Sequence, residues 1–286
     1  MMKQNEFALL KTKKLISNKI HWIPLWVLVI WSLFPLVWAF SSSFKTPVQV
    51  YETPPSLIPK NFNFSNYAKV FEYEGFWSFL FNSIFLSVIT TVLTIVVSVI
   101  SGYGFARYAF KYRNILLMMI LIPRIIPRAS LIVPLFTGIS FLGLLDTYVA
   151  LIITYTATAI PLGTWILSGF FKVIPKSLEE AATIDGARPW QVLWHVVLPI
   201  SLPAILTVGI FSLREAWNEF PFVLAFTTSS DMRTLPYQLF MLRESLGMQD
   251  WPMVLAFTLV SILPLLILYL IFEKRVVNGI TSGAVK

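Results

Sequence analysis

The sequence predicts an all-α membrane protein with six transmembrane helices. Hydrophobic residues make up 57% of its 286 residues and charged residues only 13%, a balance too apolar for a soluble domain of this length. Six stretches are long and apolar enough to cross a bilayer, which takes roughly 20 residues as helix. Cysteine is absent and only His21 and His195 are present, so neither thiolate chemistry nor a metal site is expected.

Four of the six predicted spans contain no Asp, Glu, Lys or Arg. They cover residues 22–44, 75–106, 147–171 and 251–272. The apolar run that begins at Trp22 is too long for the core of a signal peptide, so we expect an uncleaved first span.

The other two predicted spans carry charge inside the apolar run. The third covers about residues 114–142 and the fifth about 197–226, and together they contain Arg124, Arg128, Arg214, Glu215 and Glu219. A charge at the bilayer centre costs about 2.5–3.5 kcal/mol on insertion scales, so these side chains should face protein or water rather than lipid. The two arginines of the third span are four residues apart and share one helical face.

Two interpretations of these charges stay open. Intramembrane charges usually pair, so ion pairs from Arg124 or Arg128 to Glu215 or Glu219 would join the third and fifth spans. Alternatively, the arginines line a translocation path and meet an anionic solute, because a guanidinium group binds a carboxylate or phosphate through two hydrogen bonds. Uronate-containing sugars or sugar phosphates would then be candidate solutes. The candidate path residues are Arg124, Arg128, Arg214, Glu215, Trp217, Asn218 and Glu219.

The distribution of basic residues predicts the orientation in the membrane. With the N-terminus inside, fourteen Lys and Arg residues lie on the cytoplasmic side, five on the external side and three within spans. This favours cytoplasmic N- and C-termini. The net charge of +8 comes from these short basic caps, so no nucleic-acid partner is expected.

The predicted organisation follows from the spans and the orientation. The external segments 45–74 and 227–250 are predicted to be loops. The three regions are a cytoplasmic lead at 1–21, a six-span transmembrane domain at 22–272 with a cytoplasmic loop at 172–196, and a cytoplasmic tail at 273–286.

The loop at 172–196 is a polar island between two apolar spans. Ser177 and Glu180 have the spacing of a capping box at a helix start, and Gly186 is placed to end that helix in the left-handed conformation. Pro189 suits the first turn of a second helix, expected to end at Val197. One interpretation is an amphipathic connector in the interface. The other is a pair of coupling helices that presses into a moving partner.

The island resembles the EAA loop of permease subunits of ATP-binding-cassette importers. The matching residues are Glu180-Ala181-Ala182, Asp185-Gly186-Ala187, Leu198-Pro199 and Pro203. Further segments resemble the carbohydrate branch in the same order, namely Asn66-Tyr67, residues 76–83, residues 102–107, residues 142–148, residues 217–220 and residues 234–236. The tail 279–286 is similar to that of the shorter permease subunit of maltose transporters. The resemblance covers nearly the whole chain after about residue 20.

The resemblance implies a type I ABC importer permease fold and a set of partners. Those partners are a second homologous permease subunit, two ATP-binding subunits that bind ATP and Mg, an extracytoplasmic solute-binding protein, a sugar and membrane lipid. The 227–250 loop would face the binding protein, and the tail 279–286 would reach toward the ATPase subunits. The residues implied to couple to the ATPase are Glu179, Glu180, Ala181, Ala182, Asp185, Gly186 and Ala187.

The predicted function is therefore that of a non-catalytic permease subunit for sugars or oligosaccharides in the bacterial cytoplasmic membrane. The sequence contains no Gly-x-x-x-x-Gly-Lys-Ser/Thr phosphate loop, so no nucleotide cofactor is expected in this chain. Arg124 and Arg128 stand where the resembled family often has uncharged residues, which supports the anionic solute. An importer of a non-sugar solute and a stand-alone secondary transporter are the alternatives.

Overall fold

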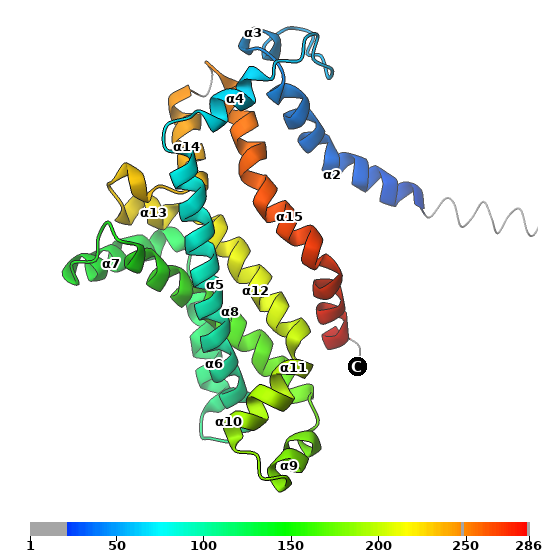
Figure 1. The fold of residues 1–286 in the computed structure, drawn as a ribbon, viewed down its shortest axis with the longest axis vertical. Coiled ribbons are helices and arrows are strands. Elements are labelled where there is room, and N and C mark those ends of the chain that lie inside the picture. Colours follow the sequence, from blue (N-terminus) through cyan, green and yellow to red (C-terminus); the bar gives the residue numbers. More distant parts are fainter. Residues whose placement is uncertain (1–21, 247–248, 285–286) are drawn as a thin grey trace, which may run out of the picture. The chain divides into compact units, whose positions relative to one another are not determined.

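The computed structural model describes residues 22–246 and 249–284, and the side chains of residues 22–246 and 249–272. Within these ranges all regular secondary structure is helical, which confirms the predicted fold class. The long helices are α2 (Trp22–Ser43), α5 (Phe76–Arg107), α8 (Tyr148–Val173), α12 (Leu202–Trp217) and α15 (Trp251–Ala284) (Figure 1). The shorter ones are α3 (Pro47–Val50), α4 (Ser65–Phe71), α6 (Arg113–Leu121), α7 (Arg128–Phe141), α9 (Lys176–Ile184), α10 (Pro189–Val192), α11 (Leu198–Ile200), α13 (Pro221–Phe226) and α14 (Leu235–Leu246), with single turns η1 (Ile122–Arg124), η2 (Leu193–Val197) and η3 (Ser230–Met232).

Four described helices are long and apolar enough to cross a membrane without interruption. They are α2, α5, α8 and the part of α15 from Trp251 to Phe272, and they coincide with the four uncharged spans predicted from the sequence. Two bent helix pairs bring the number to six if each pair counts as one span.

The third predicted span, 114–142, is wrong as a single helix. The helices on either side of Ile125–Pro127 meet at 97°. Pro127 has an extended backbone and stands just before α7, and a proline also disfavours helical geometry in the residue before it. The charged segment around Arg124 and Arg128 is therefore a break between two helices rather than the face of one.

The fifth predicted span, 197–226, is also interrupted. A bend of 80° separates Pro189–Ile200 from α12. The α-helical conformation stops again after Trp217 and resumes at Pro221, where proline occupies the first turn of α13. Asn218 to Phe220 therefore lie between helices, and Glu219 belongs to this break rather than to a helical face.

Contacts divide the chain into two compact units. The first comprises the residues up to Val70 together with Leu246–Leu259, and the second comprises Phe71–Ser245 together with the residues from Val260 onward. Inside the first unit, the Asn66 amide nitrogen donates to the carbonyl oxygens of Ser43 at 2.8 Å and Lys45 at 2.9 Å. These bonds close the part of the predicted loop 45–74 that lies between Lys45 and Asn66, and the loop contains the short helices α3 and α4. The predicted lead 1–21 lies outside the described residues, as do the side chains of the predicted tail 273–286.

In the second unit, α5 runs beside α8 and also packs against α12 (Figure 1). The buried face of α5 is lined by small and hydroxyl-bearing residues: Ser83, Ser87, Thr90, Thr94, Ser98 and Gly102. Such residues let transmembrane helices approach closely in the absence of a hydrophobic drive between them. A Cβ atom built on Gly163 of α8 would lie 2.3 Å from Ser98 Oγ and 3.0 Å from Val208 Cγ1 of α12. Gly163 is therefore required where three helices meet.

The predicted polar loop 227–250 is largely helical, which corrects the prediction. It contains η3 and the twelve-residue helix α14. Leu235, Gln238 and Leu242 are buried and recur at helical spacing, a pattern that the polar content of the segment obscures. The Asn82 amide nitrogen holds this segment to α5 by donating to the carbonyl oxygens of Asp231 at 2.6 Å and Arg233 at 2.8 Å.

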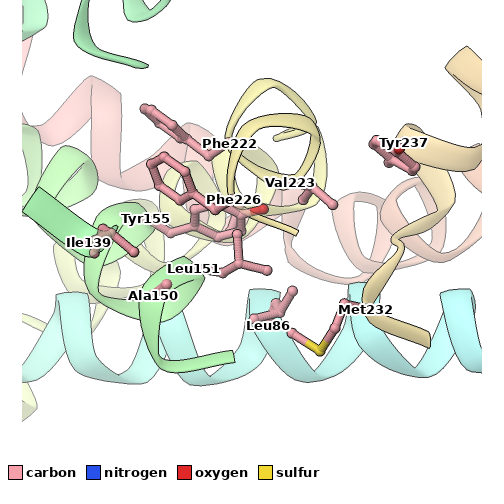
Figure 2. Close-up of a cluster of buried hydrophobic side chains, with 11 residues drawn as sticks. Leu86, Ile139, Ala150, Leu151, Tyr155, Phe222, Val223, Phe226, Met232 and Tyr237 are labelled. Carbon is pink, nitrogen blue, oxygen red and sulfur yellow. The ribbon is translucent and has the colours of Figure 1, made fainter. Parts of the chain in front are cut away.

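This segment contributes Met232 and Tyr237 to a cluster of buried apolar side chains (Figure 2). It brings together Leu86 of α5, Ile139 of α7, Tyr155 of α8, Phe226 of α13 and Met232 of η3. The two interrupted spans and the two continuous helices α5 and α8 therefore share one core, which holds the breaks in place.

Asp146 joins the turn between α7 and α8 to the start of the 227–250 segment. It has a φ of 59°, which Asp tolerates better than most residues. Its carboxylate accepts from the backbone N–H groups of Thr228 at 3.0 Å and Ser229 at 3.1 Å, and from the Ser229 hydroxyl. The hydrogen bonds from the Ser229 side chain, the Ser229 backbone and the Thr228 backbone hold the pKa of Asp146 below its usual value.

We expect Asp146→Ala to lower the free energy of unfolding in detergent by about 1–2 kcal/mol, because three hydrogen bonds to a carboxylate are lost at a half-exposed site. Asp146→Asn keeps an acceptor for the two backbone N–H groups and should cost less. The contribution of the charge is complete above the pKa of the unfolded chain, about 3.9, and is lost as the pH falls through the lower pKa of the folded chain. Below pH 4 wild type should therefore lose its advantage over Asp146→Asn, and equal costs for Ala and Asn would contradict this account.

Candidate functional site

The helix elbow formed by α9 and α10 has the predicted turn. Gly186 has a φ of +86°, the Ala187 N–H donates to Ala182 at 2.9 Å, and the Gly186 N–H donates to Thr183 at 3.0 Å. These two bonds are the Schellman pattern, which satisfies free carbonyl groups at a helix end. Pro189 stands in the first turn of α10, as predicted. The elbow is therefore closed by its own backbone and has a defined shape.

The predicted capping box at Ser177 is wrong. The first helical residue of α9 is Lys176, and no side chain caps its N-terminus. Ser177 already lies inside the first turn, whereas a capping residue needs a non-helical backbone. Glu180 is exposed and makes no bond back to the helix start.

The tip of the elbow is exposed and partly apolar. Glu180, Ala181, Asp185 and Gly186 are exposed, whereas Ala182 and Ala187 are half-buried against the apolar cluster that includes Phe171 and Val197. Ile184 is 86% exposed at the end of α9. Sequence reasoning missed Ile184 as a candidate contact residue, although an isoleucine directly before Asp185-Gly186 was the available signal.

The second helix of the elbow has the predicted apolar side but a different end. Val192 and Val197 are buried, whereas Trp190 and Trp194 are exposed. The helix does not end at Val197, because the π-helical turn η2 continues directly into α11 at Leu198. A wider π turn accommodates the missing N–H of Pro199 without a break.

Glu179 points back into the fold. Arg107, the last residue of α5, donates from Nε to Glu179 Oε1 at 2.6 Å and from Nη2 to the Ile174 carbonyl at 3.0 Å. Arg107 Nη2 also lies 2.5 Å from Glu179 Oε1, and the Tyr103 hydroxyl donates to Glu179 Oε2 at 2.9 Å. Sequence reasoning assigned no role to Tyr103 and Arg107, whose spacing of four near the end of a span was the only available signal.

A second candidate site is the intramembrane charge cluster. Arg124 lies 2.5 Å from Glu215 through Nη2, 3.3 Å from its other oxygen through Nη1, and donates to the Thr158 carbonyl at 3.3 Å. Arg128 forms an ion pair with Glu219 and lies 3.5 Å from Glu215. The breaks in the third and fifth spans thus place two guanidinium groups opposite two carboxylates, and the ion-pair interpretation describes this structure.

The two arginines also line a groove of about 360 Å³. Its other walls include Leu131, Ile153 and Thr158. Both guanidinium groups are part-exposed, whereas Glu219 is only 3% exposed. The guanidinium groups of the cluster therefore lie in the wall of the groove, whereas the carboxylate of Glu219 is buried.

The remaining predicted path residues lie apart from this groove. Arg214 is exposed and lines an almost wholly apolar groove of about 400 Å³ with Ile205 and Tyr269. Trp217 is buried, and the Asn218 side chain donates to the Arg214 carbonyl at 2.8 Å. The described ranges contain no cluster of three or more His, Cys, Asp or Glu side chains able to hold a metal ion.

Residues 94–278 match the family described as binding-protein-dependent transport system inner membrane component. The chain is 36% identical over 260 residues to the sulfoquinovosyl glycerol transport system permease protein SmoH of Agrobacterium fabrum, covering 91% of each protein. It is 35% identical to the trehalose/maltose transport system permease protein MalG of Thermococcus litoralis, covering 89% of this chain and 91% of that protein.

The fold is similar to a chain in the crystal structure of a bacterial ABC transporter involved in the import of the acidic polysaccharide alginate. The TM-score is 0.76 at 24% identity, with 92% of this chain and 97% of that chain covered. These matches confirm the predicted resemblance to permeases of the carbohydrate branch and the type I permease fold. The chain belongs to the family of binding-protein-dependent transport system inner membrane components.

Proposed function

We propose that this chain is the transmembrane permease subunit of an ATP-driven importer of sugars or oligosaccharides and forms half of the translocation path. The family match and relatives named for trehalose/maltose and sulfoquinovosyl glycerol transport support this proposal. A second, homologous permease subunit forms the other half. A non-sugar solute is the alternative within the same family.

The elbow of α9 and α10 is the proposed docking element for the ATPase, and its geometry is the observation that carries the proposal. A closed Schellman turn keeps the elbow stiff, and an exposed isoleucine beside acidic residues offers an apolar contact with a charged rim. The proposed contact residues are Glu180, Ala181, Ala182, Asp185, Gly186 and Ala187, with Ile184 added from its exposure. ATP and Mg are bound by the two partner subunits, and this chain does no chemistry.

The proposed orientation places the elbow in the cytoplasm, as the distribution of basic residues favours. The segment 227–250, with η3 and α14, then faces the extracytoplasmic solute-binding protein. Asn82 and Asp146 hold this segment to the transmembrane helices, so binding-protein contact would reach α5 and the turn between α7 and α8.

An anionic saccharide is the solute class that the charge cluster favours. Arg124 and Arg128 line the groove together, and an arginine recognises carboxylate or phosphate through paired hydrogen bonds. An acidic solute would compete with Glu215 for the two guanidinium groups.

The docking proposal predicts that Gly186→Val detaches the ATPase. A β-branched residue is strained at positive φ, so the turn must change shape, and we expect ATPase co-purified with the permease complex to fall by about tenfold or more. Gly143→Val is the matched control, because Gly143 also has a positive φ and open space around its Cβ position but lies at the turn before α8. Retention of the ATPase by Gly186→Val, or its loss from both variants alike, would contradict the proposal.

A further inference from the structure

The elbow is joined covalently to only two of the three helices that pack together in the second unit. Ile174 and Pro175 connect α9 to the end of α8, and α10 continues through η2 and α11 to the bend before α12. The central helix α5, which packs against both α8 and α12, ends at Arg107 and leads away into α6. Any direct path from the elbow to α5 must therefore be non-covalent.

Glu179 provides such a path. The side chains of Arg107 and Glu179 are only 9% and 13% exposed, so solvent screens their interaction weakly. Arg107 contacts a carboxylate on α9 and the Ile174 carbonyl at the end of α8 at the same time. A planar guanidinium group holds two acceptors in a fixed relative position, which a lysine ammonium does not. The contact therefore fixes the direction of α9 relative to α5.

Tyr103 completes the contact from one turn earlier on α5. Its hydroxyl donates to the Glu179 oxygen that Arg107 leaves free, at 2.9 Å. Its ring packs edge-on against Phe171 of α8, with the ring centroids 6.1 Å apart. Both carboxylate oxygens of Glu179 are thus held by α5, whereas the neighbouring Glu180 is exposed. Glu179 is therefore held within the fold, whereas Glu180, the next residue of the same helix, faces outward.

We propose that Arg107 and Tyr103 are positioning residues that, through Glu179, make α9 and α5 move as one body. Displacement of the elbow by the ATPase is then delivered directly to α5, and from there to the helices packed against it. This inference rests on the proposed docking of the ATPase at the elbow. It assigns to Glu179 a role in transmitting motion, distinct from the role in binding the ATPase assigned to Glu180.

The test uses the complete importer, with binding protein and both permease subunits, reconstituted in liposomes. Solute uptake per ATP hydrolysed and the amount of bound ATPase are measured together for Arg107→Gln, Glu179→Gln and the double variant. We expect uptake per ATP to fall by about fivefold or more in each single variant and no further in the double variant, as for residues acting through one contact. Bound ATPase should stay near the wild-type amount. Tyr103→Phe, which removes only a hydroxyl group, should show a smaller loss in the same direction.

Two controls separate this inference from the docking proposal. Arg113→Gln removes a half-buried arginine at the start of α6 whose side chain donates a long bond of 3.4 Å to the Tyr108 carbonyl, and it should leave uptake per ATP unchanged. Glu180→Gln should reduce the amount of bound ATPase instead. Two results would overturn the inference and leave the docking proposal intact. One is wild-type uptake per ATP in Arg107→Gln, and the other is a loss of uptake per ATP in the double variant equal to the product of the two single losses. Unchanged ATPase binding in both Glu180→Gln and Gly186→Val would overturn the docking proposal itself.

Discussion

Replacing Glu215 by glutamine is expected to lower the free energy of unfolding by about 3 kcal/mol. The substitution removes the carboxylate that Arg124 contacts with both terminal nitrogens and that Arg128 also approaches. Removing one partner of a buried ion pair costs about 3–5 kcal/mol, and the lower end applies because the Arg124 side chain is 28% exposed. Arg128 retains Glu219, but Arg124 keeps only the Thr158 carbonyl.

The double variant Arg124→Gln, Glu215→Gln should recover at least half of that loss, because two neutral amides replace an unpaired guanidinium group. Denaturant unfolding in detergent measures Arg124→Gln, Glu215→Gln and the double variant as a double-mutant cycle. Arg214→Gln is the matched control, since Arg214 is exposed and no described carboxylate lies within ion-pair distance of it. A double variant less stable than Glu215→Gln would mean that the pair is not what stabilises the breaks in the two spans.

The same double variant decides between an anionic and a neutral solute. It is expected to recover at least half of the stability lost in Glu215→Gln, and it removes the Arg124 cation from the groove. If the solute is an acidic saccharide, we expect uptake to be largely lost while the binding protein still binds the solute. Unchanged uptake of the native solute by the stable double variant would remove the anionic interpretation and leave the ion pairs a purely structural role.

Gly163→Val is expected to lower the free energy of unfolding by about 3 kcal/mol, at the upper end of typical overpacking costs. Even the first added carbon would lie 2.3 Å from Ser98 Oγ, 3.0 Å from Ser98 Cβ and 3.0 Å from Val208 Cγ1. Rotation of Ser98 can relieve the first contact but not the other two. The helices α5, α8 and α12 must therefore separate, and the hydroxyl-lined face of α5 loses its close packing.

Gly169→Val is the control for this prediction. Gly169 lies on the same helix, is exposed, and would place an added Cβ in open space. The intrinsic cost of valine for glycine in a helix is thus shared by both variants, and the difference in unfolding free energy isolates the packing term. Similar stabilities for the two variants would show that α8 does not depend on contact at Gly163.

The uncharged spans were predictable because each depends on the length of an apolar run, which is a local property of the chain. The elbow was predictable for a related reason, since Gly186 and Pro189 act on the backbone at their own positions. The breaks in the third and fifth spans were not predicted, although Pro127 and Pro221 stand beside them. The apolar composition of a segment predicts that it lies in the membrane, but it does not predict whether the helix bends there.

The residues 227–250 show the opposite error. Their polar content predicted a loop, whereas Leu235, Gln238 and Leu242 form the buried face of α14. The proposed capping box failed because a match of residue types at the right spacing does not establish where a helix begins. For Ser177 the difference is a single residue.

By itself, the sequence determined an all-helical membrane protein, the left-handed turn at Gly186 and the presence of charges that lipid cannot accept. The length of an apolar run, the backbone preferences of glycine and proline, and the free-energy cost of burying a charge do not depend on distant residues. Only the tertiary structure decided the partners of those charges. Arg124 meets Glu215 across 91 residues and Arg107 meets Glu179 across 72. Such pairs depend on which faces of separate helices come into contact, and the close approach of small residues along α5 and α8 selects those faces.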